Sequence, residues 1–196
     1  MSKRLFVSGV AAAVVVGAAL LLSIHRAPSA GPLAAGSDTT ITGIALDENQ
    51  VASVGVFVPV PAGSEGVVLD RVQLVDPTSG IHLVDARVST GRGQSFVCVG
   101  SALRFPPPDC RLFPVEGWRV SAQAMAAGGF QLVLGLKTTQ TGAAWYPGVA
   151  LEYHDTNGSY KEILRQGGEL CAPRDRYLAS GCPDRDKVAA AQSRLG

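Results

Sequence analysis

Clustered charge is scarce in this chain of 196 residues. Lysine and arginine together number 17 and aspartate and glutamate 16, which leaves a net charge of +1. The basic residues are scattered along the chain, and aromatic residues do not interleave with them. Nucleic-acid binding depends on a concentrated basic surface. We therefore expect no nucleic-acid partner.

The sequence also lacks the motifs of common catalytic and metal sites. It contains no G-x-S-x-G element, no P-loop and no D-x-D-x-D calcium loop. Among the three histidines, His25 adjoins an apolar run, and His82 shares strand parity with apolar residues, which predicts a partly buried position in an apolar wall. His154 stands beside Asp155, but adjacent residues of a strand point to opposite faces. We therefore expect a non-enzymatic protein that needs no cofactor.

One long apolar run does occur, from Leu5 to Ile24, without a charged residue. Twenty helical residues span about 30 Å, the thickness of a bilayer core. A cleaved secretory signal is the alternative, but its apolar region is usually shorter, and no A-x-A triplet follows this run. Lys3 and Arg4 precede it, which favours a cytoplasmic N-terminus. We expect residues 1–26 to be a cytoplasmic stub and a single-pass signal-anchor helix, with secretion after cleavage as the alternative.

All four cysteines follow the apolar run, as expected of an exported chain that forms disulfide bonds. Three connectivities are possible, and we favour Cys98 with Cys110 and Cys171 with Cys182 because these pairs close short loops. The first pair has neither the C-x-x-C spacing of a metal or redox site nor an intervening histidine. The cysteines are therefore expected to be structural.

From about residue 39 the pattern is typical of β-structure. Over residues 130–137, Phe130, Leu132, Leu134 and Leu136 alternate with other side chains at the period of a half-buried strand. Further strands are expected at residues 39–46, 53–60, 68–76, 81–88, 94–99, 118–123, 149–153 and 159–165. Short strands joined by turns predict an all-β fold, an immunoglobulin-like antiparallel β-sandwich preceded by one N-terminal transmembrane helix.

The expected organisation has four parts. Residues 1–26 form the membrane segment, and residues 27–38, rich in Ser, Gly, Pro and Ala, form a flexible tether. The β-sandwich occupies residues 39–172. Residues 173–196 form a disulfide loop and a short helix after Pro183.

Two hairpin-like segments carry a resemblance. "YPGVALEYHDTNGSYKEILRQGGELC" (residues 146–171) has a strand ending in Tyr153, a tight turn, a strand opening with Tyr160 and a nearby cysteine, and "GVVLDRVQLVDPTSGIHLVDARV" covers residues 66–88. These segments resemble hairpins of uncharacterised exported or membrane-anchored β-sandwich proteins of high-GC Gram-positive bacteria. The resemblance implies location and fold, and it implies no activity.

Two groups of residues are candidates for an interaction surface. Pro106, Pro107 and Pro108 predict an extended polyproline segment inside the first cysteine loop, which could dock a partner or act as a stiff spacer. Trp145 and Tyr146 precede a strand and could form a recognition patch or belong to the core.

These features together favour a membrane-anchored extracytoplasmic module. We expect a non-enzymatic interaction or accessory role in the cell envelope, with an envelope protein or polymer as partner. The alternative is an extracytoplasmic small-ligand or metal-binding protein in which His82 or His154 contributes.

Overall fold

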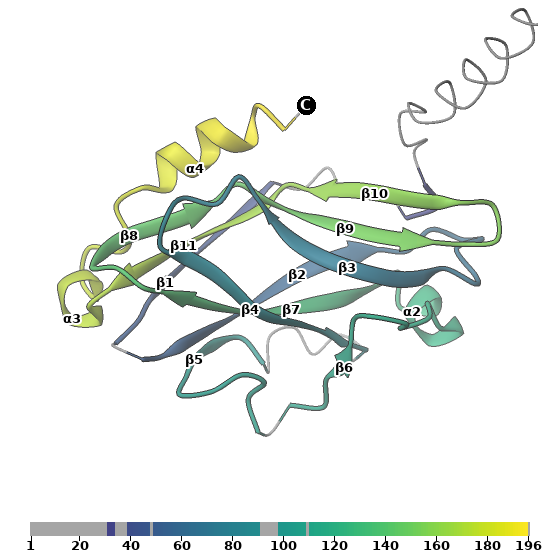
Figure 1. Ribbon diagram of the computed structural model, residues 1–196, viewed down its shortest axis with the longest axis horizontal. Helices are drawn as coiled ribbons and strands as arrows, with labels where there is room; N and C mark the ends of the chain where they lie inside the picture. The colour runs from purple at the N-terminus through teal and green to yellow at the C-terminus, as the bar shows by residue number, and fades with distance from the viewer. Residues whose placement is uncertain (1–30, 34–38, 48, 91–97, 109, 196) are drawn as a thin grey trace, which may run out of the picture.

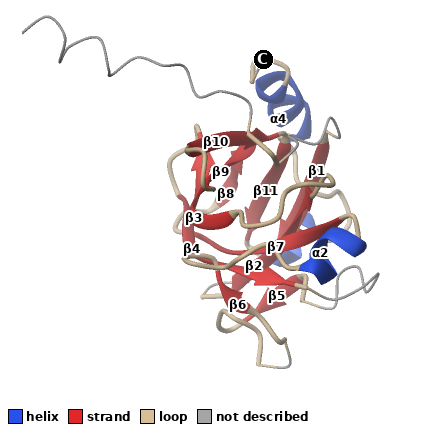
Figure 2. Ribbon diagram, turned by 90° about the vertical axis from the view of Figure 1, so that its right-hand side faces the viewer, coloured by secondary structure: helices blue, strands red, loops and turns tan. Residues whose placement is uncertain are grey.

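The strands form three sheets arranged in two layers (Figures 1 and 2). The computed structural model describes residues 31–33, 39–47, 49–90, 98–108 and 110–195. One layer is a five-stranded sheet of order β5-β2-β7-β4-β6, with β2 Val51–Pro59, β4 Ile81–Ser89, β5 Gly100–Ala102, β6 Phe113–Pro114 and β7 Gly129–Thr138. The other layer holds sheet β10-β9-β3 (Ser159–Leu164, Gly148–His154 and Val68–Val75) and sheet β1-β11-β8 (Thr40–Ala45, Gln166–Ala172 and Gly142–Tyr146). The prediction of an all-β fold is confirmed.

The core lies between these two layers. The four alternating side chains of β7, from Phe130 to Leu136, are each at most 2% exposed, as their period of two predicts. Leu69 of β3 and Leu151 of β9 are completely buried and belong to the same hydrophobic cluster. Apolar contact between the layers is therefore the main source of stability, because burying one large aliphatic side chain contributes about 1.5–3 kcal/mol.

Within the described residues, three short helices accompany the strands: α2 (Ala122–Ala126), α3 (Arg174–Tyr177) and α4 (Arg185–Gln192). Helix α4 confirms the helix expected after Pro183. It is joined to β1 and to the residue between β10 and β11, because Gln192 Nε2 donates hydrogen bonds to Thr40 O (3.0 Å) and to Arg165 O (2.9 Å). Figure 1 shows it on the outside of its layer.

The prediction of a strand at residues 118–123 is wrong. Only an isolated bridge joins Arg119 to Val68, and helix α2 begins soon afterwards. The hydroxyl of Ser121 accepts a hydrogen bond from the Ala124 N–H (3.1 Å) and so caps the helix. Alanine is the best helix former, and alanine repeats through α2.

Part of the segment expected to be a tether lies in the folded domain. Leu33 is 1% exposed, and its N–H donates to the hydroxyl of Tyr153 (3.2 Å). The backbone of residues 31–32 also bonds to side chains, since Gly31 N donates to Glu162 Oε1 (3.0 Å) and Ser64 Oγ donates to Pro32 O (3.0 Å). Residues 31–33 are therefore held against the domain.

The expected membrane helix, residues 5–24, lies outside the described residues. Among the helices of the described ranges, none has the length and apolar character needed to cross a bilayer. Most of the strand expected at residues 94–99 also lies outside them.

Candidate interaction site

Both disulfide bonds form as predicted. Cys98 is bonded to Cys110 and Cys171 to Cys182, with a Cα–Cα distance of 5.8 Å in each pair. The bonds close two loops, the first stapled loop (residues 98–110) and the second stapled loop (residues 171–182). Neither bond joins one layer to the other. Disulfides of this kind are typical of proteins in oxidising compartments.

The first stapled loop lies on the outer face of the five-stranded sheet. The Phe105 ring packs directly on Gly135 of β7, where an added Cβ would collide with it. At Gly55 of β2, an added Cβ would collide with the Gln131 side chain of β7 and would also lie only 3.2 Å from Val99 Cγ2 of the loop. Gly135 thus makes room for Phe105 of the loop, and Gly55 makes room for Gln131 and, next to it, Val99.

This packing buries residues that point away from the core. Val133 alternates with core leucines and faces outward, yet it is completely buried. Val133 is the cross-strand partner of Gly55, which Val99 approaches. Ser53, 2% exposed, is the cross-strand partner of Gly135, which Phe105 covers. The loop therefore covers a second, smaller apolar contact, and its base is fixed by packing as well as by the disulfide bond.

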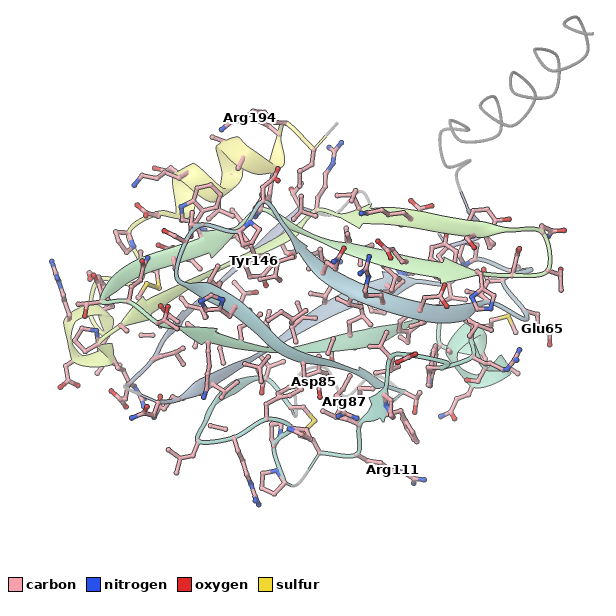
Figure 3. All side chains as sticks on the ribbon, in the orientation of Figure 1. Glu65, Asp85, Arg87, Arg111, Tyr146 and Arg194 are labelled. Atoms are coloured by element: carbon pink, nitrogen blue, oxygen red, sulfur yellow. A yellow bond between two sulfur atoms is a disulfide. The ribbon has the colours of Figure 1, made fainter. Side chains whose placement is uncertain are left out.

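The tip of the first stapled loop faces solvent. Leu103 is 81% exposed, the highest value among the large apolar side chains of the described residues. Arg104 follows it and is also exposed. Arg111, just past the disulfide, extends away from the body of the molecule (Figure 3) and lies 5.7 Å from the centroid of the Phe113 ring. The loop thus exposes an aliphatic side chain and, next to it in the sequence, a guanidinium group.

The predicted proline surface belongs to the same loop. Pro106 and Pro108 are exposed, and Pro107 is partly buried. The Pro107 carbonyl accepts a hydrogen bond from Cys110 N (3.2 Å), which ties the proline segment to the disulfide. The prolines therefore lie on a surface that a partner can reach.

The second stapled loop has a similar composition. Tyr177 of α3 is its buried aromatic residue, and Leu178 beside it is 62% exposed. Arg174 and Arg176 are exposed, and the Arg176 guanidinium lies 5.5 Å from the centroid of the Tyr177 ring. This loop provides a natural control for experiments on the first one.

The two aromatic candidates lie in different environments. Trp145 of β8 is half-buried, and its backbone N–H donates a hydrogen bond to Thr78 Oγ1 (2.8 Å). Tyr146 is completely buried between the layers (Figure 3). Burial raises the pKa of Tyr146, and its hydroxyl has no hydrogen-bond partner within the described part of the chain. Of these two residues, Trp145 alone offers exposed surface.

His154 is paired across strands. Its Nδ1 lies 2.8 Å from Asp70 Oδ1, and no serine hydroxyl of the described ranges is within hydrogen-bond distance of it. Asp155 instead holds the β9–β10 turn, because its Oδ1 accepts from Asn157 N (2.6 Å) and Gly158 N (3.0 Å). Partial desolvation acts to raise the pKa of Asp155, but these hydrogen bonds lower it, and the net shift is downward.

The expectation that His82 forms part of an apolar wall is wrong. It is exposed, and its Nε2 lies 3.4 Å from Thr139 Oγ1. A register shift between Leu83 and Asp85 of β4 reverses the alternation of faces. His82 consequently points outward, whereas Val88 further along the strand points into the core.

A buried glutamate, Glu169, lies next to the second disulfide bond. Ligand atoms of Glu169, Cys171 and Cys182 lie within 4.8 Å of one another, but the two sulfurs are bonded to each other and offer no thiolate. Glu169 is 1% exposed and accepts a hydrogen bond from Asp184 N (2.6 Å). Burial raises the pKa of Glu169, and the Asp184 hydrogen bond opposes this.

Together these observations define the chain as an all-β domain with two disulfide-stapled loops. No model of a known protein family matches it, and no curated protein matches it at a significant level.

Proposed function

We propose that this chain is a membrane-anchored, extracytoplasmic β-sandwich of the immunoglobulin-like class. Its role is that of a non-enzymatic interaction module of the cell envelope. Two layers of mainly antiparallel strands around one core support the class. Two disulfide bonds and the apolar run at residues 5–24 support the location.

The first stapled loop is the proposed contact surface. The observation that carries this is the 81% exposure of Leu103 on a loop whose base is fixed. A loop already held in one conformation loses little conformational entropy on binding. Arg104 makes no ion pair within the described part of the chain. We propose a partner, a protein or polymer of the envelope, that combines an apolar contact with acidic groups.

A pair of leucine variants tests this proposal. The full-length chain, purified in detergent, is incubated with solubilised envelope material, and bound components are quantified for the wild type, Leu103→Ser and Leu178→Ser. Leu178 is the matched control because it is an exposed leucine of the other stapled loop.

We expect Leu103→Ser to weaken retention of a specific component by about tenfold, the effect of losing about 1.4 kcal/mol of buried apolar contact. Leu178→Ser should retain it as the wild type does. Equal retention by all three proteins would assign binding to another surface.

A further inference from the structure

A cavity of about 530 Å³ lies at the end of the fold next to α3, and none of its lining residues belongs to the first stapled loop. Three segments that are distant in sequence form it. Asn49 and Gln50 come from the β1–β2 turn, Lys137 and residues 138–141 from the end of β7 and the turn to β8, and Ala172 and Pro173 from the end of β11. The volume is within the range of small-molecule sites, about 300–1,000 Å³.

Several lining groups are occupied by one another. Gln50 Nε2 donates to Asp47 Oδ2 (3.1 Å), the Thr138 hydroxyl donates to Gln140 O (3.2 Å), and Gln140 Nε2 donates to Ala143 O (3.3 Å). These contacts hold the two turns in place, and they leave the remaining polar groups of the lining available.

Three lining side chains have no protein partner within the described residues. Asn49, Lys137 and Thr141 make neither a hydrogen bond nor an ion pair there. They offer an amide, an ammonium group and a hydroxyl to the same cavity.

The charge of the described lining is positive. Lys137 is its one ionised side chain, and the lining includes no aspartate or glutamate. The carboxylate of Asp47, in the turn that carries Asn49, is hydrogen-bonded to Gln50. An anionic ligand would therefore gain a favourable interaction with Lys137.

The neutral polar groups of the lining favour a ligand that carries hydroxyl groups. An apolar ligand would cover amides and hydroxyls without replacing their hydrogen bonds to water, which is unfavourable. A ligand rich in hydroxyls can pair with Asn49 and Thr141 as donor or acceptor.

We propose that this cavity binds a small anionic sugar, a monosaccharide-sized polyol carrying a carboxylate or phosphate group. Lys137 pairs with the anionic group, and Asn49 and Thr141 pair with hydroxyls. This site does not depend on the role proposed for the first stapled loop, because no residue is shared between them.

Titration followed by NMR tests the site. The ¹⁵N-labelled full-length chain in detergent is titrated with glucuronate, glucose 6-phosphate, glucose and inorganic phosphate. We expect glucuronate or glucose 6-phosphate to give saturable shifts in the amides of residues 49 and 138–141. Which of the two binds more tightly identifies the anionic group. Glucose should bind at least about tenfold more weakly, since it lacks a partner for the ammonium group.

Three variants assign the contacts. Lys137→Gln should weaken binding of the anionic sugar by about tenfold. Asn49 has φ of +66°, so Asn49→Gly removes the amide while tolerating that backbone conformation, and it should also weaken binding. Lys161→Gln is the matched control, because Lys161 is exposed on β10 and paired with Glu152 (3.4 Å), and binding should be unchanged.

Several results would overturn the proposal. These are the absence of saturable shifts with either anionic sugar, equal affinity for glucose and glucuronate, or unchanged binding by Lys137→Gln. Inorganic phosphate that binds as tightly as glucose 6-phosphate would show that the sugar ring is not recognised, which also contradicts it.

Discussion

The Tyr153 hydroxyl accepts a 3.2 Å hydrogen bond from the N–H of Leu33, a residue 120 positions earlier in the chain. The Leu33 side chain is 1% exposed within the main core. The segment before β1 therefore belongs to the folded domain, and a soluble fragment that begins after residue 33 would lack part of its core.

Replacement of Leu33 tests this contact. Leu33→Ala should lower the free energy of unfolding by about 2–5 kcal/mol, because the buried side chain leaves a cavity. Leu178→Ala, at a position 62% exposed, should change it by less than about 0.5 kcal/mol. Thermal unfolding of the full-length chain, followed by tryptophan fluorescence, measures both. Equal midpoints for the two variants would contradict burial of Leu33.

Two buried tyrosines should respond differently to loss of their hydroxyl groups. The Tyr146 hydroxyl has no hydrogen-bond partner in the described ranges, so Tyr146→Phe should leave stability unchanged or raise it by about 1 kcal/mol. The Tyr153 hydroxyl bonds to Leu33 and to Glu162 Oε1 (3.2 Å), so Tyr153→Phe should lower it by about 1 kcal/mol. Denaturant unfolding of both variants gives the comparison, and a loss for Tyr146→Phe equal to that for Tyr153→Phe would point to an additional polar partner of Tyr146.

Gly135 should be required for the first stapled loop to pack against β7. Gly135→Ala places a methyl group in the position of the Phe105 ring, and we expect a cost of about 1–3 kcal/mol and a displaced loop. Trypsin should then cleave faster after Arg104 and Arg111 than in the wild type, as mass spectrometry can follow. In a Phe105→Ala background the same substitution should cost less, because the collision is removed. Additive effects of the two substitutions would contradict the contact.

The buried acid beside the second disulfide predicts a pH dependence. Burial raises the pKa of Glu169 in the folded chain. Its contribution to stability is therefore fully present below the pKa of the unfolded chain and is lost as pH rises through the higher folded value. Glu169→Gln should remove this loss, so the variant should become more stable relative to the wild type as pH rises above the pKa of the unfolded carboxyl group. Glu152→Gln, on the sheet surface, is the control, and the same pH trend in both variants would exclude Glu169 as its cause.

Strong alternation of apolar residues made the centre of the fold predictable. The β7 strand from Gly129 to Thr138 and its neighbour β2 follow the period of two that the sequence shows. Strands β8 and β11 were missed because glycine and alanine occupy many of their positions and leave little apolar contrast between faces. The local pairing of the cysteines could be predicted because both pairs close short loops.

Other features depended on tertiary contacts that no local pattern contains. The outward position of His82 follows from a bulge in β4, and a bulge shifts parity without leaving a sequence signal. The composition of residues 27–38 indicated a tether, although Leu33 within it is buried by residues far along the chain. The cavity at Lys137 combines three distant segments, so no single stretch of sequence reveals it.

The proposed contact through the first stapled loop is tested most directly by photo-crosslinking in intact cells. A photoreactive amino acid replaces Leu103 in one full-length protein and Leu178 in another. We expect a discrete crosslinked product from position 103 that is lost in the Cys98→Ser, Cys110→Ser background, since the disulfide bond holds the loop. No product from position 103, or the same product from position 178, would contradict the proposed role of this loop.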